Sequence, residues 1–348
     1  MKSKSLTTIS KIIKEAKKGK MFILVDDKNR ENEGDLVIPA SKCNSKIINF
    51  MAIHGRGLIC LALTKKQVDK LSLPLMSSVN KARMQTAFTV SIEAKKGITT
   101  GISAFDRAKT IKTAINSKSK KKDIVSPGHV FPLVARTGGV LERAGHTEAS
   151  VDISLLSKLN PSAVICEVMN EDGRMARLDD LIKFSKKHNL KIASIEDLIS
   201  YRLENEKLVN KLTSKQTNIL NFGKFHLTTF QNKLDKNFNF AIVKGKIRSN
   251  KSIRVRVIST ILKNNKLNIK RKIFKKSLKY LNKFSNFALI IIKDQKPNIK
   301  KNSEESNIKS THTCVDPYVT DNFKEYFHNL ELIEKKVEDI PLDSFQKL

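Results

Sequence analysis

The sequence predicts an α+β protein with two domains: a layered α/β domain with a mixed sheet, then a smaller α/β domain. Three observations support this prediction. The chain has 348 residues, enough for two ordinary domains. Over the first 200 residues, short apolar runs rich in β-branched residues alternate with helical patterns, which is typical of a sheet covered by helices. Beyond Tyr201–Lys215, a charged stretch that we expect to be a helical connector, the residue pattern differs from that of the first 200 residues.

The strands of the first domain are expected where apolar residues gather in runs of strand length. Leu58–Thr64 (LICLALT) and Ala163–Met169 (AVICEVM) have the continuous apolar character of buried strands. The expected strands are Phe22–Val25, Asp35–Ala40, Leu58–Thr64, Ala87–Ile92, Ala163–Met169 and Leu190–Ala193.

The helices are expected from their start signals and their apolar periodicity. Ser103 and Asp106 have the S-x-x-D form of a capped helix start, and Ser194 and Asp197 repeat it. The expected helices are Ile47–Ile53, Ser103 to about Ile115, Thr147–Leu159, a helix with Leu178, Leu181, Ile182 and Ser185 on one face, and Ser194 to about Tyr201.

The second domain has fewer signals. We expect strands at Phe238–Ile247, Ile253–Ser259 and Asn286–Ile292, with a basic helix at Ile269–Phe284. Lys293–Asp316 is polar and rich in lysine, asparagine and serine, which predicts a mobile loop.

Composition excludes several classes of protein. Hydrophobic residues make up 40% of the chain, too many for wholesale disorder. No apolar run approaches the roughly 20 residues of a membrane span, and the N-terminus lacks the apolar core of a secretory signal. The four cysteines are Cys43, Cys60, Cys166 and Cys314, and their wide spacing argues against a zinc site and a disulfide framework. A reducing cytoplasmic compartment is expected.

The net charge of +32 raises the alternative of a basic nucleic-acid-binding protein. The excess is spread along the whole chain, and it comes from 53 lysines against 13 arginines. Arginine is the residue that bidentate readout of bases and phosphates favours. Compositional drift explains the charge better, so we expect neither a nucleic-acid nor a membrane partner.

An acidic cluster follows the first strand. The segment from Asp26 to Asp35 (DDKNRENEGD) holds five carboxylates in a chain that is otherwise strongly basic. Such a cluster attracts a hard divalent cation and supports proton transfer. The planar guanidinium of Arg30 within it can form paired hydrogen bonds to a phosphate. A solvated acidic loop is the competing interpretation, and the spacing alone leaves both open.

A second candidate segment is rich in glycine and contains two of the seven histidines. His129 lies in Pro127–Leu133, and His146 stands between Gly145 and the start of a predicted helix, which Thr147 is placed to cap. A helix N-terminus next to Arg143 is a typical binding site for a phosphate. Thr99-Thr100-Gly101, before the helix at Ser103, is another such seat, although for a lone threonine an ordinary glycine turn is the competing interpretation.

Together, five segments resemble the 3,4-dihydroxy-2-butanone 4-phosphate synthase family of riboflavin biosynthesis: DDKNRENEGDLVIPA, HGRGLICLALT, TAFTVSIEAKKGITTGISAFDRAKTI, PGHVFPLVARTGGVLERAGHTEASVDI and ICEVMNEDGRMARLDDL. The resemblance runs from about Thr8 to Arg202. Two stretches depart from the family pattern, Lys81–Gln85 (KARMQ) and the lysine-rich Ser117–Lys122.

The resemblance implies that the chain converts D-ribulose 5-phosphate to L-3,4-dihydroxy-2-butanone 4-phosphate and formate with Mg²⁺ or Mn²⁺, two ions per site, and no zinc. It implies a homodimer with shared active sites, in which His146 serves the neighbour's site. The implied metal ligands are Glu31 and His146. The implied substrate contacts are Arg30, Glu31, Asp35, Thr100, Arg143, Ala144, Gly145, His146, Thr147 and Glu167. The implied catalytic residues are His129, Glu167, Asp26 and Glu33. Cys60 lines the family's site, although by itself it is an ordinary buried thiol.

The domains predicted on this basis are a synthase domain at residues 1–203 and, at residues 204–348, a degenerate domain that resembles GTP cyclohydrolase II. Phe222–Phe225 and Phe240–Gly245 resemble the opening of that domain. Its zinc site needs three cysteines, and residues 204–348 contain only Cys314. A bifunctional enzyme that retains cyclohydrolase activity is therefore the weaker alternative.

Overall fold

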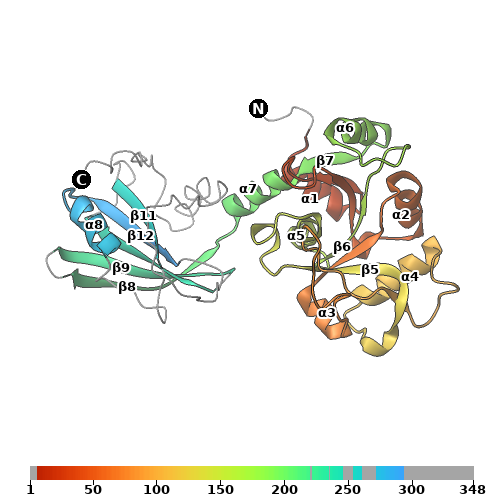
Figure 1. Cartoon of the computed structure of the whole chain (residues 1–348), viewed down its shortest axis with the longest axis horizontal. Coiled ribbons are helices and arrows are strands. Elements are labelled where there is room, and N and C mark those ends of the chain that lie inside the picture. The colour runs from red at the N-terminus through yellow and green to blue at the C-terminus, as the bar shows by residue number, and fades with distance from the viewer. Residues whose placement is uncertain (1–5, 220–221, 235, 246–253, 261–271, 294–348) are drawn as a thin grey trace. The chain divides into compact units, whose positions relative to one another are not determined.

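The computed structural model describes residues 6–219, 222–234, 236–245, 254–260 and 272–293 (Figure 1). The chain divides into two compact units, Met1–Arg202 and Leu203–Leu348. Each unit contains helices and a mixed sheet, so the α+β prediction is confirmed.

The first unit is built on a seven-stranded sheet in the order β4-β5-β3-β6-β2-β1-β7. Its antiparallel pairs include β1 with β2 and β2 with β6, whereas β3 with β5 and β1 with β7 run parallel. The strands are β1 (Phe22–Val25), β2 (Gly34–Pro39), β3 (Cys60–Thr64), β4 (Ile92–Ala94), β5 (Ile124–Ala135), β6 (Ser162–Glu167) and β7 (Lys191–Ser194).

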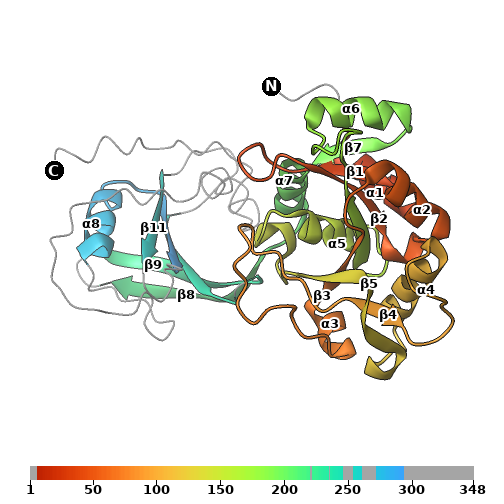
Figure 2. The same ribbon diagram turned by 45° about the vertical axis from the view of Figure 1, so that its right-hand side comes forward.

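Helices cover both faces of this sheet, as the turned view in Figure 2 shows. Side chains alternate between the faces: Ile23 and Val25 of β1 enter one core cluster, and Phe22 and Leu24 enter the other. The first cluster includes residues of α2 (Ser45–Phe50), α3 (Lys65–Leu71), α4 (Ala104–Ile115) and α6 (Leu178–Lys187). The second includes residues of α1 (Ile9–Lys17), α5 (His146–Leu156) and α7 (Ile195–Asn205). Short helices lie at Ala40–Lys42, Met51–Gly55, Lys121–Asp123 and Gly139–Leu141.

Most predicted elements of this unit are present within a few residues of their expected bounds. The hydroxyls of Ser103 and Ser194 accept hydrogen bonds from the backbone N–H groups of Asp106 and Asp197, so both predicted helix starts are confirmed. The strand predicted at Ala87–Ile92 is wrong in position. Phe88 and Thr89 make only isolated bridges, and β4 begins at Ile92, where pairing with β5 starts. Among the longer elements of this unit, α1, α3 and β5 were not predicted.

A buried ion pair fixes the end of the unit. Arg202 of α7 donates to Asp152 of α5 at 2.7 Å and to the carbonyl of Gly138 at 2.9 Å. Asp152 also accepts from the N–H of Val140 at 2.8 Å. Gly139 has φ +62°, and a Cβ there would lie 2.2 Å from the Asp152 carboxylate, so the pair closes over a position that favours glycine. Residue 202 therefore helps to hold the chain that leads into α5.

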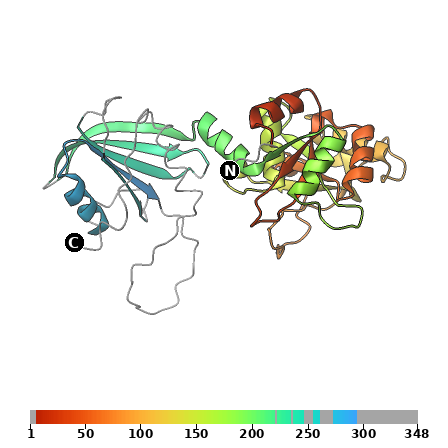
Figure 3. The same cartoon turned by 90° about the horizontal axis from the view of Figure 1, so that it is seen from above.

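The second unit contains a five-stranded sheet in the order β11-β12-β10-β9-β8. Its elements are β8 (Val209–Ile219), β9 (Gly223–Asn232), β10 (Phe238–Lys244), β11 (Arg254–Thr260), α8 (Lys272–Leu281) and β12 (Phe287–Lys293). Figure 3 shows α8, in blue, against one face of the sheet, where Phe274 and Leu278 enter a core cluster with residues of β10 and β12.

The helical connector predicted at Tyr201–Lys215 is correct only as far as Asn205, where α7 ends. Beyond it, Lys211 and Lys215 belong to β8. This polar segment is extended because it pairs with β9 along its length, from Val209 opposite Asn232 to Ile219 opposite Gly223. Such pairing is a long-range constraint that charge spacing does not carry.

Two predictions fall wholly or largely outside the described residues, namely the loop at Lys293–Asp316 and the place of Cys314. Within the described part of the chain, none of the helices has the length and apolar character needed to span a membrane.

Candidate functional site

Carboxylates gather at one edge of the seven-stranded sheet. Asp35 of β2 lies directly opposite Glu167 of β6. Asp26 follows the last residue of β1, Val25, which pairs with Gly34 at the start of β2. Three neighbouring strands therefore bring acidic side chains to the same edge, although Asp26 and Glu167 are 141 positions apart in the sequence.

Asp26 organises the acidic loop after β1. Its buried carboxylate accepts from the backbone N–H groups of Glu31 at 3.1 Å and Glu33 at 2.8 Å, and from the Arg30 guanidinium at 2.7 Å. Arg30 also pairs with Glu31. Arg177 donates to the carbonyls of Glu31 and Asn32 from outside the loop. The acidic segment is therefore a structured loop, and the alternative of a solvated acidic stretch is wrong.

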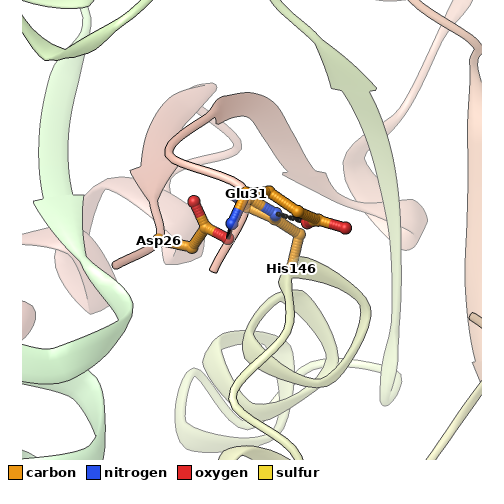
Figure 4. Close-up of side chains that lie close together, drawn as sticks. All are labelled: Asp26, Glu31 and His146. Atoms are coloured by element: carbon orange, nitrogen blue, oxygen red, sulfur yellow. Dashed lines mark hydrogen bonds and ion pairs between the residues drawn. The ribbon is translucent and has the colours of Figure 1, made fainter. Parts of the chain in front are cut away.

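His146 enters this cluster from the first residue of α5 (Figure 4). Its Nδ1 lies 3.8 Å from a Glu31 oxygen, and its Nε2 lies 3.8 Å from an Asp35 oxygen. One ligand atom from each of Asp26, Glu31 and His146 lies within 4.8 Å of the others. Nε2 of His146 is buried and has no hydrogen-bond partner among the described residues.

The electrostatics show how strongly these groups interact. His146 and Arg30 outweigh burial and lower the pKa of Glu31 to about 2. Burial raises the pKa of Asp35 to about 7, despite the nearby His146. Burial lowers the pKa of His146, but Asp35 and Glu31 outweigh it and raise the pKa to about 9. Burial also raises the pKa of Glu33. The cluster therefore favours a positive charge at its centre.

These residues fit a divalent cation. Carboxylate oxygens and an imidazole nitrogen are ligands that Mg²⁺ and Mn²⁺ accept. The unpartnered Nε2 of a buried histidine is an unusual cost unless something binds there. A bound ion would take the place of the proton that His146 holds.

Glu167 is held at the rim of the cluster. One of its carboxylate oxygens accepts from the N–H of Leu58 at 2.8 Å. A Cβ at Gly57 would lie 2.5 Å from that oxygen, so the close approach requires glycine. Cys60 nearby is buried, and burial raises the pKa of its thiol, so it remains a protonated packing residue.

The segment from Arg143 to Thr147 forms the start of α5. Arg143 contacts Glu148, Met84 and Thr86, Ala144 is exposed, and Gly145 is the N-cap residue. Thr147 is buried inside the first turn, so the expectation that it caps the helix is wrong. The N–H groups of this turn have no intrahelical acceptor and suit an anion.

His129 and Thr100 form a separate group. His129 bonds to Glu93, and a Cβ at Gly101 would collide with both side chains. Asp106 accepts from Thr99 and from the N–H of Gly101, which holds the exposed Thr100 between them.

The strand register fixes where His129 stands relative to the acidic cluster. Phe131 of β5 and Ile165 of β6 both pair with Cys60 of β3, so His129 stands at the same sheet edge as Glu167, two strands away. With strands about 4.8 Å apart, this separation is roughly 10 Å.

The structure thus brings together Asp26, Arg30, Glu31, Glu33, Asp35 and His146, with Glu167 paired to Asp35. Three residues that organise the site were not predicted in that role: Glu93, Asp106 and Glu148. Asp106 was predicted only as a helix-start residue, and Glu148 stands unassigned inside the quoted GHTEAS segment.

The resemblance assigns His146 to the neighbouring subunit's site. Within its own chain, His146 lies against Glu31 and Asp35. The reason is topological: α5 packs on β2, so the first residue of the helix reaches the edge where Asp35 stands.

Comparison with known proteins decides the family. Residues 10–201 match the family described as 3,4-dihydroxy-2-butanone 4-phosphate synthase. The chain belongs to this family. It is 48% identical over 253 residues to the 3,4-dihydroxy-2-butanone 4-phosphate synthase of Photobacterium phosphoreum, covering 73% of this chain and 69% of that protein. It is 51% identical over 257 residues to the riboflavin biosynthesis protein RibBA of Aquifex aeolicus, covering 73% of this chain and 63% of that protein. The chain thus spans less than two thirds of the length of RibBA.

Solved structures extend the comparison. The crystal structure of RibBX, a two-domain 3,4-dihydroxy-2-butanone 4-phosphate synthase from A. baumannii, has a TM-score of 0.75 and 35% identity, covering 97% of this chain and 94% of that one. A synthase solved in complex with two magnesium ions has a TM-score of 0.55 and 37% identity, covering 57% and 98%.

The cluster geometry predicts that metal binding requires both Glu31 and His146. Glu31→Gln and His146→Ala should each weaken Mn²⁺ binding at least tenfold, a loss of about 1.4 kcal/mol, because each removes a ligand atom. Electron paramagnetic resonance of free Mn²⁺ measures this directly. Asp27→Asn is the matched control, since Asp27 lies in the same loop and its side chain accepts a local hydrogen bond from the N–H of Asn29. Unchanged Mn²⁺ affinity in both ligand variants would exclude the site.

The intrachain contact of Glu31 with His146 makes a second prediction. Mixing inactive Glu31→Gln and His146→Ala subunits should restore no activity, because each subunit's site carries its own defect. Formate release after verified subunit exchange measures this. Mixing wild-type with Glu31→Gln subunits is the control and should retain activity. Recovery in the mixture of the two variants would show that the sites are shared between subunits after all.

Proposed function

We propose that the edge of the seven-stranded sheet converts D-ribulose 5-phosphate to L-3,4-dihydroxy-2-butanone 4-phosphate and formate, a step of riboflavin biosynthesis. The observation that carries this proposal is the buried, unpartnered Nε2 of His146 among Asp26, Glu31 and Asp35, in a chain of the synthase family. The reaction needs proton removal, loss of water, a carbon shift, and addition of a water molecule that lets one carbon leave as formate, so no water is lost overall.

We propose that Glu31 and His146 hold Mg²⁺ or Mn²⁺. A bound cation of this kind polarises a carbonyl and its neighbouring hydroxyls. The magnesium-bound relative supports two ions, and the oxygen and imidazole donors here suit both metals. The cysteine spacing gives no support to zinc.

The sugar phosphate needs donors on the other side of the cluster. We propose that Arg143, with the N–H groups of Ala144, His146 and Thr147, receives the phosphate, and that Arg30, Asp35 and Thr100 contact the rest of the substrate. Gly145 contacts the substrate without its N–H, which donates to the carbonyl of Arg143 at 2.8 Å. Arg143 and the start of α5 supply positive charge and free N–H groups at one place.

Proton transfer is assigned to Glu167 and His129. Glu167 faces Asp35 across the strand pair and is fixed by the N–H of Leu58, and His129 is paired with Glu93. Glu33, half-buried beside the cluster, is a further candidate. Asp26 is occupied by three donors, so we assign it the role of holding the loop that carries Glu31.

We propose that residues 204–348 are a degenerate GTP cyclohydrolase II-like domain without that activity. The single cysteine of this segment, Cys314, cannot supply the three zinc ligands. The similarity to a two-domain synthase over nearly the whole chain supports a second domain that need not be a cyclohydrolase. Relatives named RibBA favour the bifunctional alternative.

We propose that the reaction takes place in a homodimer in the cytoplasm. The family resemblance supports a homodimer, and the scattered cysteines support the cytoplasm. The small-molecule substrate needs neither a nucleic acid nor a membrane as partner.

Truncation tests whether residues 1–203 carry the activity without the second domain. Residues 1–203 should release formate from ribulose 5-phosphate within roughly tenfold of the full chain, a barrier change of about 1.4 kcal/mol, because all proposed site residues precede Arg202. The full chain should release no formate from GTP, with or without zinc. Formate assays with both substrates measure this.

The same fragment carrying Arg202→Leu is a structural control. It should lose about 3–5 kcal/mol of stability, because Asp152 stays buried without its arginine. Thermal unfolding of the two fragments compares them. A folded 1–203 fragment that binds ribulose 5-phosphate without turning it over would contradict the proposal, since the second domain would then complete the active site.

A further inference from the structure

We propose that Glu148 is a positioning residue that holds the Arg143 guanidinium at the phosphate end of the site. The inference rests on the proposed function, because it concerns the residue assigned there to the substrate phosphate. It begins from a buried carboxylate to which neither the motifs nor the metal cluster gives a role.

Glu148 lies in the first turn of α5 and is only 1% exposed. Both of its carboxylate oxygens are engaged. Oε2 accepts from Nη1 of Arg143 at 2.6 Å, and Oε1 accepts from the backbone N–H of Arg136 at 3.0 Å. A buried carboxylate is costly unless such donors meet it, so this arrangement fixes the Arg143 side chain firmly.

The other side of the guanidinium is held by a segment far away in the sequence. Nε and Nη2 of Arg143 both donate to the carbonyl of Met84, at 3.3 and 2.9 Å, and Nη2 donates to the hydroxyl of Thr86 at 3.0 Å. Met84 belongs to the KARMQ stretch that departs from the family pattern. A backbone carbonyl is the acceptor there, so the contact does not depend on the side chain at residue 84.

Counting donors shows what remains for a ligand. A guanidinium has five N–H groups. Four are used by Glu148, Met84 and Thr86, which leaves one N–H on Nη1. Arg143 therefore offers a single, aimed hydrogen bond beside the free N–H groups of α5, and Glu148 sets the plane in which that bond points.

Gly145 leaves room for this arrangement. A Cβ at this position would lie 2.2 Å from Nη1 of Arg143 and 2.9 Å from Oε2 of Glu148. The ion pair therefore passes directly against the backbone that would bind the anion. The side chain of Arg143 and the N–H groups of α5 thus form one anion-binding site, and Glu148 holds the two parts next to each other.

Glu148→Gln tests the assignment, with inorganic phosphate as the probe. Glutamine has one acceptor and one donor group, so it cannot accept from both Arg136 and Arg143. We expect phosphate binding by the full-length protein, measured by calorimetry, to weaken about tenfold, equivalent to about 1.4 kcal/mol. The KM for ribulose 5-phosphate should rise in parallel, while kcat changes much less. A structural role alone would lower stability without this split between KM and kcat.

Glu142→Gln is the matched control. Glu142 is exposed, lies beside Arg143 in the sequence and accepts from the N–H of Gly138 at 2.9 Å, so this variant removes the same charge without touching the pair. Its phosphate affinity and KM should stay within about twofold of wild type. In an Arg143→Ala background, Glu148→Gln should add no further loss, because Glu148 acts through Arg143.

Two results overturn the proposal. One is wild-type phosphate affinity in Glu148→Gln. The other is that adding Glu148→Gln to Arg143→Ala weakens phosphate binding as much as it does in the wild-type background. If Glu148→Gln does not fold, Arg143→Lys takes its place. Lysine keeps the charge but cannot bridge Glu148, Met84 and Thr86 together. We therefore expect the same loss of phosphate affinity, and wild-type phosphate affinity in this variant would contradict the proposal.

The probe also separates this proposal from the proposed function. Phosphate binding that depends on Glu148 in a protein that forms no formate would reject only the function. Formate production with phosphate binding independent of Glu148 would reject only the positioning role.

Discussion

Negative charge concentrated around one buried imidazole is the constraint on which the site depends. Glu31 and Asp35 both approach His146, and Asp26 lies behind them. Like charges this close, at the rim of an apolar sheet, are unfavourable unless a positive charge is held between them. In the structure that charge is shared by Arg30 and the histidine, whose pKa is raised to about 9. A divalent cation would satisfy the same demand with more charge.

The surrounding fold meets this constraint by giving each acidic group specific donors. Asp26 receives two backbone N–H groups and Arg30, and Glu167 receives the N–H of Leu58. Glu148 and Asp152 on α5 are paired with Arg143 and Arg202. Helix α5 thus carries a metal-ligand candidate at its first residue and two buried ion pairs behind it. Arg30, Arg143 and Arg202 each bridge more than one acceptor, which the planar guanidinium suits better than lysine does.

The sequence predicted those parts of the molecule that depend on local pattern. Apolar runs identified β1, β2, β3 and β6, and the serine caps located the starts of α4 and α7, because these signals lie within a few residues. The acidic cluster stood out because its charge opposes that of the rest of the chain. The quoted motifs led to the family, which the comparisons confirm over residues 10–201.

The parts that were missed depend on contacts between distant segments. The sequence of β8 has the charge pattern of a helix, but the segment is a strand because it pairs with β9. That His146 meets Glu31 within one chain follows from the packing of α5 on β2, which no spacing encodes. The role of Glu148 needs Met84 and Thr86, some 60 residues earlier, to complete the enclosure of Arg143.

A crystal structure of the protein with Mn²⁺, using anomalous scattering to locate the metal, tests whether one chain holds the ion. We expect an anomalous peak between the Glu31 carboxylate and the His146 ring of the same chain, within bonding distance of both. A peak elsewhere, a peak bridging Glu31 and a histidine of another subunit, or no peak at saturating Mn²⁺ would contradict this expectation.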